Sequence, residues 1–213
     1  QWYTVSKRSR TYVEKIISKI SGEYFKNYQI NKIKCRDHGV DLYYGGNNEF
    51  FGYDKVVIAT HADEALAMIE NPSDLEKETL SNFSYKENIA YIHTDQSVMP
   101  ENKKAWCSWN SSMKKNEIKK NSITYWLNLL QNLECEENIF LTLNPYFDIE
   151  ESKILKKVKF THPYFDQSAL DYQSKLKNLQ NKRNILFCGS YFGYGFHEDG
   201  IKSSIEMLKN LND

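Results

Sequence analysis

One stretch near the C-terminus, NILFCGSYFGYGFHEDGIKSS at residues 184–204, constrains the fold more than any other part of the chain. It opens on an apolar run at residues 185–188, which is typical of a buried strand. A loop with three glycines follows, at Gly189, Gly193 and Gly195. The chain then shows helical spacing of apolar residues at Ile201, Ile205, Leu208 and Leu211. Because a helix start directs backbone N–H groups and a positive dipole outward, this pattern predicts a site for a polar or anionic ligand.

Composition argues against several classes of partner. The 28 Lys and Arg residues balance 28 Asp and Glu residues, so there is no basic field for nucleic acid. No apolar run has the length of a membrane span, and we expect none. Four cysteines are scattered without a C-x-x-C pair, and no spacing supports a metal site. We therefore expect reduced thiols in a cytoplasmic protein without a bound metal.

The remaining sequence alternates between helix and strand signals. Apolar spacing predicts helices at residues 9–21, 62–69, 73–82 and 166–179, with Ser73 as an N-cap. A hairpin is expected from residues 29–35 and 40–44, and a buried strand at residues 55–59. Further strands are expected at 89–94, 105–109, 123–128, 139–143 and 153–161, with turns at 45–48 and 114–120. The predicted fold class is α/β with α+β character and a mostly antiparallel sheet in the middle of the chain.

The stretch at residues 184–204 resembles the C-terminal flavin motif of FAD-dependent amine-oxidase-like proteins, in particular a bacterial group of NAD/FAD-binding proteins. That group carries a similar G-x-Y-x-G-Y-G-F-H-E-D-G run. Further matches follow the family order: FFGYDKVVIATHADEAL (50–66), IHTDQSVMP (92–100), AWCSWN (105–110), TYWLNLLQNL (124–133), LTLNP (141–145) and HPYFD (162–166). The resemblance implies the C-terminal part of a two-lobed FAD-binding fold. Residues 1–70 would belong to the FAD-binding domain, residues 71–182 to a substrate-binding lobe, and residues 183–213 to a strand and helix that return to the first domain.

FAD is the cofactor that the resemblance implies. The resemblance assigns cofactor contacts to residues of the loop and the helix start: Gly189, Ser190, Phe196, His197, Glu198, Asp199 and Gly200. It adds Ile30, Ala59 and Thr60 from two strands. Two alternatives stay open: Asp199 is also a good residue for capping a helix without any ligand, and the two strands are also ordinary core strands. His61, at the end of the second strand, is either a proton carrier or a residue satisfied by a loop carbonyl.

Aromatic residues in the middle of the chain are candidates for a substrate cavity. We assign substrate contacts to Trp109, Tyr125 and Trp126, and the alternative for each is core packing. Other candidates of this kind are His93, Trp106, His162 and Tyr164. No Ser–His–Asp triad appears, and no residue is identified as a general base.

The early G-x-G-x-x-G fingerprint of such flavoproteins is absent from this sequence. We therefore interpret the chain as the C-terminal portion of a longer protein, whose N-terminal dinucleotide-binding half lies in cis or on a separate chain. The implied function is that of a flavin-dependent oxidoreductase that takes a hydride equivalent from a small apolar or amine substrate. The alternative is a non-catalytic fragment or subunit that acts as a binding module.

Overall fold

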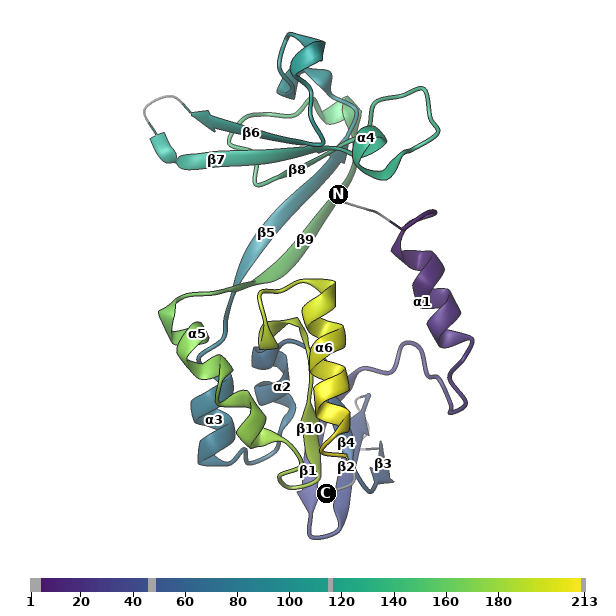
Figure 1. The fold of residues 1–213 in the computed structure, drawn as a ribbon, viewed down its shortest axis with the longest axis vertical. Helices are drawn as coiled ribbons and strands as arrows, with labels where there is room; N and C mark the ends of the chain where they lie inside the picture. Colours follow the sequence, from purple (N-terminus) through teal and green to yellow (C-terminus); the bar gives the residue numbers. More distant parts are fainter. Residues whose placement is uncertain (1–4, 46–48, 115–116, 212–213) are drawn as a thin grey trace. The chain divides into compact units, whose positions relative to one another are not determined.

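The computed structural model describes residues 5–45, 49–114 and 117–211 of the 213-residue chain (Figure 1). The chain forms two compact units. Unit 1 comprises Gln1–Tyr24 and Glu87–Thr161, and unit 2 comprises Phe25–Lys86 and His162–Asp213. The predicted limits at 70/71 and 182/183 separate segments that would bind cofactor from segments that would bind substrate, whereas the two units are separated by how compactly their residues pack. The predicted limits therefore stay predictions.

Unit 2 contains two small sheets with helices around them. An antiparallel sheet has the order β1-β2-β3, formed by β1 (Ile30–Arg36), β2 (Gly39–Tyr44) and β3 (Glu49–Tyr53). A parallel sheet pairs β4 (Val56–Ile58) with β10 (Ile185–Phe187). The helices are α2 (Ala62–Met68), α3 (Asp74–Leu80), α5 (Gln167–Gln173) and α6 (His197–Leu208), and 3-10 turns lie at Leu176–Leu179 and Ser190–Phe192.

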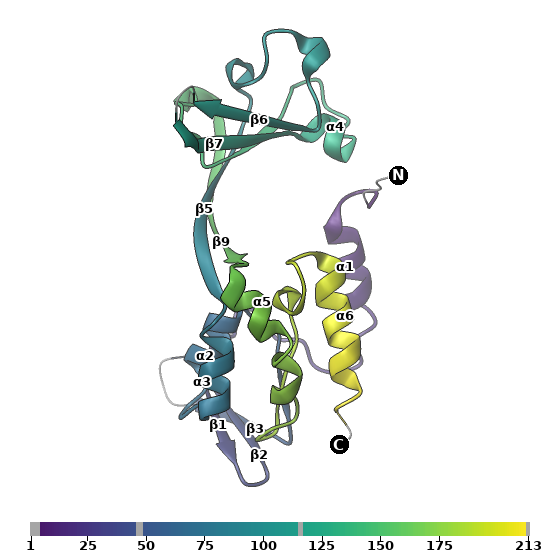
Figure 2. The ribbon, with the colours of Figure 1, turned by 60° about the vertical axis from the view of Figure 1, so that its left-hand side comes forward.

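Side chains of β10 alternate between two apolar layers, as the pleat of a buried strand requires. Ile185 and Phe187 join the main core, whereas Leu186 packs with Met207 of α6 in a second cluster. The main core also takes buried side chains from β1, β2, β4, α2 and α3. Figure 2 shows α6 on one side of the strands and α2 and α3 on the other. The predicted hairpin and both predicted strands are confirmed. β10 is buried as predicted, whereas in β4 only Ile58 is buried and Val57 is exposed.

A buried ion pair joins α3 to the turn before β10. The predicted cap of α3 is confirmed, because Ser73 Oγ accepts from the Glu76 backbone N–H at 3.3 Å while Glu76 Oε2 accepts from the Ser73 N–H at 2.6 Å. The same carboxylate, which is only 3% exposed, accepts from Arg183 Nη1 at 2.7 Å. Arg183 lies at φ +55°, in the left-handed region that a large side chain seldom adopts.

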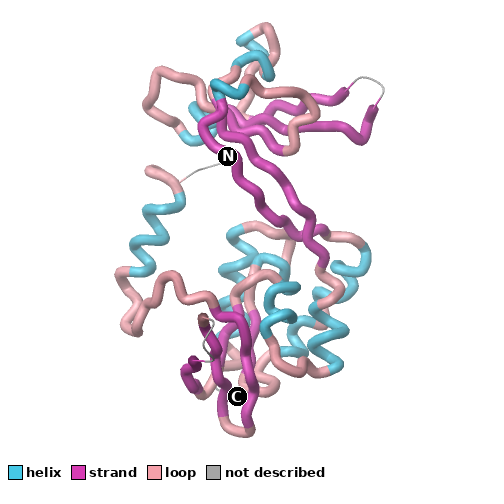
Figure 3. The backbone as a smooth tube through the Cα atoms, turned by 180° about the vertical axis from the view of Figure 1, so that it is seen from behind, coloured by secondary structure: helices cyan, strands magenta, loops and turns pink. Residues whose placement is uncertain are grey.

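Unit 1 is built on one antiparallel sheet, drawn as long magenta strands in Figure 3. The sheet order is β6-β7-β8-β5-β9. Its strands are β5 (Ser84–His93), β6 (Trp109–Lys114), β7 (Glu117–Trp126), β8 (Phe140–Leu143) and β9 (Ile154–Tyr164), and β5 and β9 each extend by a few residues into unit 2. The other elements are α1 (Ser9–Ile17), α4 (Leu127–Gln131) and 3-10 turns at Gln96–Val98, Lys103–Ala105 and Glu151–Lys153.

A chain of buried polar side chains crosses one face of this sheet. His93 is fully buried, and its Nδ1 accepts from the Asp95 N–H at 3.2 Å, which leaves the proton on Nε2 for Thr142 Oγ1 at 2.8 Å. Thr142 in turn shares a 2.8 Å hydrogen bond with Thr124. Burial lowers the pKa of His93, so the ring is neutral. These hydrogen-bonded side chains are therefore part of the buried interior of unit 1.

Several predicted boundaries are wrong for local reasons. The strand expected at residues 105–109 begins only at Trp109, because Ala105 ends a 3-10 turn that Asn102 caps and residues 106–108 have no regular secondary structure. The strand expected to reach residue 128 ends at Trp126, where α4 begins. The helix expected at 166–179 divides into α5 and a 3-10 turn, and α1 stops at Ile17.

Two predicted turns fall partly outside the described residues. Gly45 is described as a turn residue, whereas residues 46–48 are not described. The turn expected at 114–120 is shorter than predicted, because Lys114 already pairs with Glu117; residues 115–116 are not described. The strand β3, which follows the first of these turns, was not predicted, and all five of its residues are exposed.

Candidate cofactor site

The candidate site lies where the two parallel strands of unit 2 end. The Cys188 N–H donates to the Ile58 carbonyl at 3.1 Å, which places the residues that follow β4 beside those that follow β10. A Cβ built on Gly189 would stand 3.7 Å from the Thr60 carbonyl oxygen. The sequence-predicted residues Ala59, Thr60, Gly189 and Ser190 are therefore brought together. Open α/β sheets bind their ligands at this edge, outside the carboxyl ends of the strands.

The loop after β10 is held by hydrogen bonds within the chain. The N–H groups of Gly193 and Gly195 both donate to the Ser190 carbonyl at 3.1 Å. Asp199 Oδ2, in the first turn of α6, accepts from the Tyr194 and Phe196 N–H groups at 3.0 Å each. The capping interpretation of Asp199 is therefore correct for its carboxylate, which is engaged inside the loop.

The positions of the three glycines in this loop favour glycine for different physical reasons. A Cβ on Gly189 would stand 2.7 Å from the Tyr191 ring, and a Cβ on Gly193 would overlap the Asp199 carboxyl group. Gly195 has φ +92°, a conformation that favours glycine. Gly200 has none of these reasons, because a Cβ there would meet only the Ser190 nitrogen, at 4.0 Å. No contact among the described residues requires glycine at this position inside a helix, where it costs about 1 kcal/mol relative to alanine.

The backbone nitrogen of Ser190 lies beside this position, 4.0 Å from the Cβ built on Gly200. Within the described part of the chain, the Ser190 N–H donates no hydrogen bond, although its carbonyl accepts two. The residue is half-buried. A donor without an acceptor, next to a glycine that leaves the backbone accessible, fits a ligand that approaches the backbone closely.

Two phenols lie at the loop: half-buried Tyr85 of β5 and buried Tyr191, which belongs to the loop itself. Tyr85 Oη accepts from the Ala62 N–H at 2.8 Å, and burial raises the pKa of Tyr85 to about 12. Burial also raises the pKa of Tyr191, whose ring packs against Phe83 with centroids 5.4 Å apart. His61 stacks on Tyr85 with ring centroids 4.3 Å apart and an interplanar angle of 15°. Both phenols are therefore neutral, and the predicted role of His61 as a proton carrier stays a prediction.

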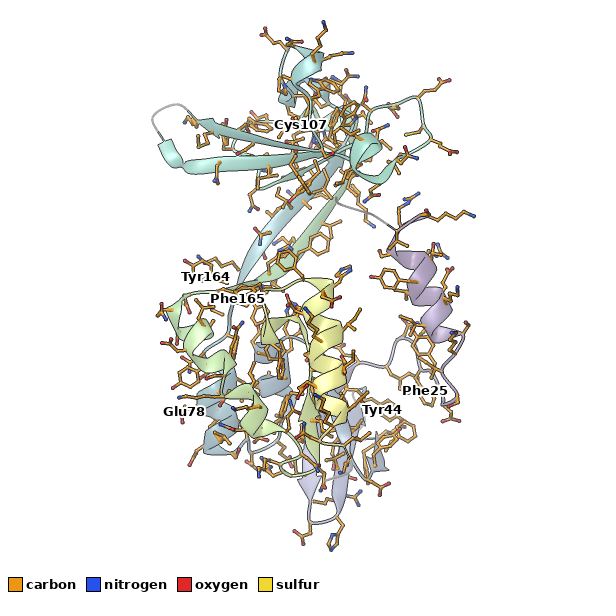
Figure 4. The ribbon with its side chains drawn as sticks, viewed as in Figure 1. Phe25, Tyr44, Glu78, Cys107, Tyr164 and Phe165 are labelled. Atoms are coloured by element: carbon orange, nitrogen blue, oxygen red, sulfur yellow. The ribbon has the colours of Figure 1, made fainter. Side chains whose placement is uncertain are left out.

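The end of β9 also packs against the loop. A Cβ on Gly195 would stand 3.4 Å from the Phe165 ring and 3.6 Å from Pro163. Phe165 also lies 6.5 Å, between ring centroids, from exposed Tyr194, and Figure 4 labels Phe165 beside the last residue of β9, Tyr164. The predicted site residues Phe196, His197 and Glu198 lie at this exposed end of the loop.

A cleft of about 650 Å³ opens beside β4 in unit 2. Its lining includes Ile30, Val57, Ala59, Thr60, Glu64 and Met68. The predicted residue Ile30 from β1 therefore meets Ala59 and Thr60 across one cleft.

Among the described strands, β4 pairs only with β10, so its other edge is open, and Val57 is 42% exposed. Parallel sheets are normally covered on both faces, and this one is incomplete.

The aromatic residues beside this cleft were not predicted as a group. Tyr44 stacks on Phe51 with ring centroids 5.0 Å apart, and Phe25 lies 6.2 Å from the same ring (Figure 4). Tyr28, which lines the cleft, contacts Phe25 and Tyr44. The alternation of Tyr44, Phe51 and Tyr53 on one face of β2 and β3 is the signal that reveals them.

The predicted substrate residues of unit 1 divide between the two faces of its sheet. Trp109 and Tyr125 are direct partners in the β6–β7 register, and Trp109 is 53% exposed. Trp126 lies on the opposite face, where its Nε1 donates to Asn138 at 3.0 Å and its ring packs on Trp106. Of the three predicted substrate residues, only Trp109 and Tyr125 therefore share one face of the sheet.

Within the residues that the structure describes, no three His, Cys, Asp or Glu side chains are grouped so as to hold a metal ion. All four cysteines are free thiols. In the same described ranges, no helix combines the length and apolar character needed to cross a membrane.

Comparison with known proteins identifies the architecture. No protein-family model and no curated protein matches the sequence. Putrescine oxidase bound to putrescine aligns with a TM-score of 0.66 and 8% identity, over 98% of this chain and 54% of that chain. A CLA-producing fatty acid isomerase from P. acnes aligns with a TM-score of 0.64 and 14% identity, over 94% and 51%. UDP-galactopyranose mutase in its reduced form aligns with a TM-score of 0.58 and 13% identity, over 89% and 48%.

This chain has the fold of about half of each of these enzymes. The predicted fold class is confirmed: it is α/β with α+β character, and it corresponds to the C-terminal part of an amine-oxidase-like fold. At 8 to 14% identity, these likenesses establish the fold alone. The chain spans about half the length of the solved structures that it matches.

Proposed function

We propose that this chain is the C-terminal portion of a flavin-dependent oxidoreductase that binds FAD at the carboxyl ends of β4 and β10. The observation that carries the proposal is the open space at Gly200, beside Ser190. No side chain or backbone contact accounts for glycine at this position inside α6, and the neighbouring Ser190 N–H has no acceptor among the described residues. The resemblance of residues 189–200 to a flavin motif supplies the identity of the ligand.

The residues present fit a flavin at this position. Without a side chain at Gly200, a ligand can approach the backbone of α6 closely, and the Ser190 N–H is a donor beside it. The start of α6 directs its positive dipole end toward the same edge of the sheet, which stabilises negative charge on a bound group. A bound flavin would supply the hydride-accepting chemistry, and the chain would supply orientation and electrostatic tuning.

The proposal includes a second half that completes unit 2. The open edge of β4 can accept a further parallel strand, and exposed Val57 leaves room for a helix on the α6 side of the sheet. The matching surface is an apolar stripe on α6 formed by Ile201, Ile205 and Leu208, which are 56%, 57% and 54% exposed. We infer that a dinucleotide-binding half, in cis or on a separate chain, covers these surfaces.

The proposed substrate is a small apolar molecule or an amine. Trp109 and Tyr125 present aromatic surface on one face of the unit 1 sheet, next to half-buried Leu141 of β8, the register partner of Tyr125. Such a surface favours apolar groups and, through the aromatic faces, a cationic amine. We assign no general base. The free thiols fit the proposed cytoplasmic location.

The alternative function is a non-catalytic binding module. It is favoured by the open β4 edge and by the cleft beside it, because the isolated chain leaves these apolar surfaces exposed. In that case the chain would recruit a partner through the same surfaces without any bound flavin.

The test uses the complete gene product that contains this chain. The protein is loaded with FAD and mixed without oxygen with a panel of primary amines and unsaturated fatty acids. Our proposal predicts that at least one class bleaches the visible flavin bands, and that W109A slows bleaching whereas S152A, a substitution at an exposed position in a 3-10 turn, does not. A complete protein that takes up no FAD would favour the binding-module alternative, and a loaded protein that no member of the panel reduces would overturn the proposed substrate class.

A further inference from the structure

We infer that Gln173, the last residue of α5, is a positioning residue that fixes the loop of the candidate cofactor site before the cofactor binds. Its Nε2 donates to the Tyr191 carbonyl at 3.2 Å and to the Gly193 carbonyl at 2.5 Å. Gln173 thus reaches two residues of the loop that follows β10. This inference rests on the proposed function, because the loop matters only if a flavin lies against it.

The peptide between Gly193 and Tyr194 is held at both of its ends. Its carbonyl accepts from Gln173, and its N–H donates to Asp199 Oδ2 at 3.0 Å. A peptide group is planar, so fixing its oxygen toward α5 directs its N–H to the opposite side, toward α6. The result is a continuous row of aligned dipoles from the α5 amide through one peptide to the Asp199 carboxylate.

No other described residue replaces Gln173 in this contact. Among the described residues, the carbonyls of Tyr191 and Gly193 accept hydrogen bonds only from this amide. A primary amide presents two N–H donors, which suits two neighbouring carbonyls. Loss of the amide therefore leaves the orientation of the Gly193–Tyr194 peptide to Asp199 alone, and glycine at position 193 opposes rotation only weakly.

The consequence for a bound flavin is electrostatic. Preorganised dipoles stabilise charge without reorganising during reduction, whereas a loop that rotates must first be ordered. Asp199 places a negative charge at the start of α6, and the row of dipoles that ends on it partly offsets this charge. We therefore expect Gln173 to affect both the affinity for the flavin and its reduction potential.

The chain provides a matched control on the same helix. Gln167, the first residue of α5, is exposed, and its Nε2 donates to Asp171 one turn later at 2.8 Å. Removing that amide leaves the loop untouched. Q173M deletes the donors at similar volume, and Q173E keeps the shape but replaces donors with acceptors; Q167M is the control.

The experiment measures all three variants in the complete gene product. In flavin-free protein, hydrogen exchange is followed at the amides of Tyr194, Gly195 and Phe196. With FAD, affinity and midpoint potential are measured. We expect Q173M and Q173E to exchange at least about 10-fold faster and to bind FAD about 10-fold more weakly, as loss of about 1.4 kcal/mol implies. Q167M is expected to match the wild type in both measurements, and the potential is expected to change only in the Gln173 variants.

The outcomes separate this inference from the proposed function. Faster exchange with unchanged FAD affinity and potential would reduce Gln173 to a purely structural residue and overturn the inference, while the proposed function would stand. Unchanged exchange would overturn it as well. If the wild-type complete protein binds no flavin, the proposed function itself fails, and the assignment of a positioning role falls with it.

Discussion

Outside its own helix, the atom nearest to a Cβ built on Gly200 is the backbone nitrogen of Ser190, 4.0 Å away. Gly200 therefore differs from Gly189, Gly193 and Gly195, where a close neighbour or a positive φ favours glycine. We expect G200A to increase the free energy of unfolding by about 0.5 to 1 kcal/mol, because alanine favours the helix and its methyl group has room. The same substitution is expected to weaken FAD binding at least about 10-fold. Urea unfolding and FAD titration measure the two effects.

Gly193 provides the comparison for that experiment. A Cβ there would overlap the Asp199 carboxyl group, so G193A is expected to lower the free energy of unfolding by about 1 to 3 kcal/mol. If G200A also destabilised the protein, the gap beside Ser190 would have no special status and the ligand argument would fail.

The ion pair between Glu76 and Arg183 is expected to contribute far more stability than the exposed pairs. R183M leaves a carboxylate that is 3% exposed without its cation, and we expect a loss of about 2 to 3 kcal/mol. The control K175M breaks the exposed pair with Glu78 and is expected to cost less than about 0.5 kcal/mol. Equal losses in urea unfolding would contradict this ranking.

Asp95 of unit 1 is expected to make stability depend on pH in the acid range. Burial opposes ionisation, but hydrogen bonds from Glu150 and Ser97 and the Lys153 ammonium together lower the pKa of Asp95 from 3.8 to about 2. A lowered folded-state pKa gives stability that is present above pH 3.8 and is lost as the pH falls through about 2. The loss amounts to about 2 kcal/mol. D95N should show a smaller decrease in the free energy of unfolding between pH 4 and 2, and an equal decrease would refute the assignment.

Trp109 is expected to affect substrate binding more than stability. Because its side chain is 53% exposed, we expect W109A to change the free energy of unfolding by less than about 0.5 kcal/mol. If the open face of the sheet contacts substrate, the variant should raise KM for an apolar substrate several-fold. The matched variant W126F, on the opposite face, should instead affect stability, since its indole N–H bonds Asn138. The opposite pattern would remove Trp109 from the substrate surface.

The parts of the site that follow one another in sequence were predictable. The strand, the glycine-rich loop and the start of α6 lie within residues 184–204, and local periodicity with glycine spacing predicts all three. The pairing of Ala59 and Thr60 with Gly189 depends on a parallel contact between strands far apart in sequence, and it was reached through the family resemblance rather than through spacing.

The contacts that hold the loop were not predictable from local pattern. Gln173 meets carbonyls 18 and 20 residues further along the chain, and Tyr85 meets an N–H 23 residues before it. A polar residue at a helix end gives no sequence signal for such a contact. The apolar spacing of Ile201, Ile205 and Leu208 predicted the helix correctly but not the exposure of that stripe, because periodicity does not tell whether the covering partner lies in the same chain.

Titration of the complete gene product with FAD tests the central claim most directly. Our account predicts saturable binding at one FAD per chain, visible as a shift of the flavin absorption bands, and weaker binding by G200A at equal or greater stability. A complete protein that folds and unfolds cooperatively but leaves the absorption bands of added FAD unchanged would contradict the assignment of residues 189–200 as a flavin site.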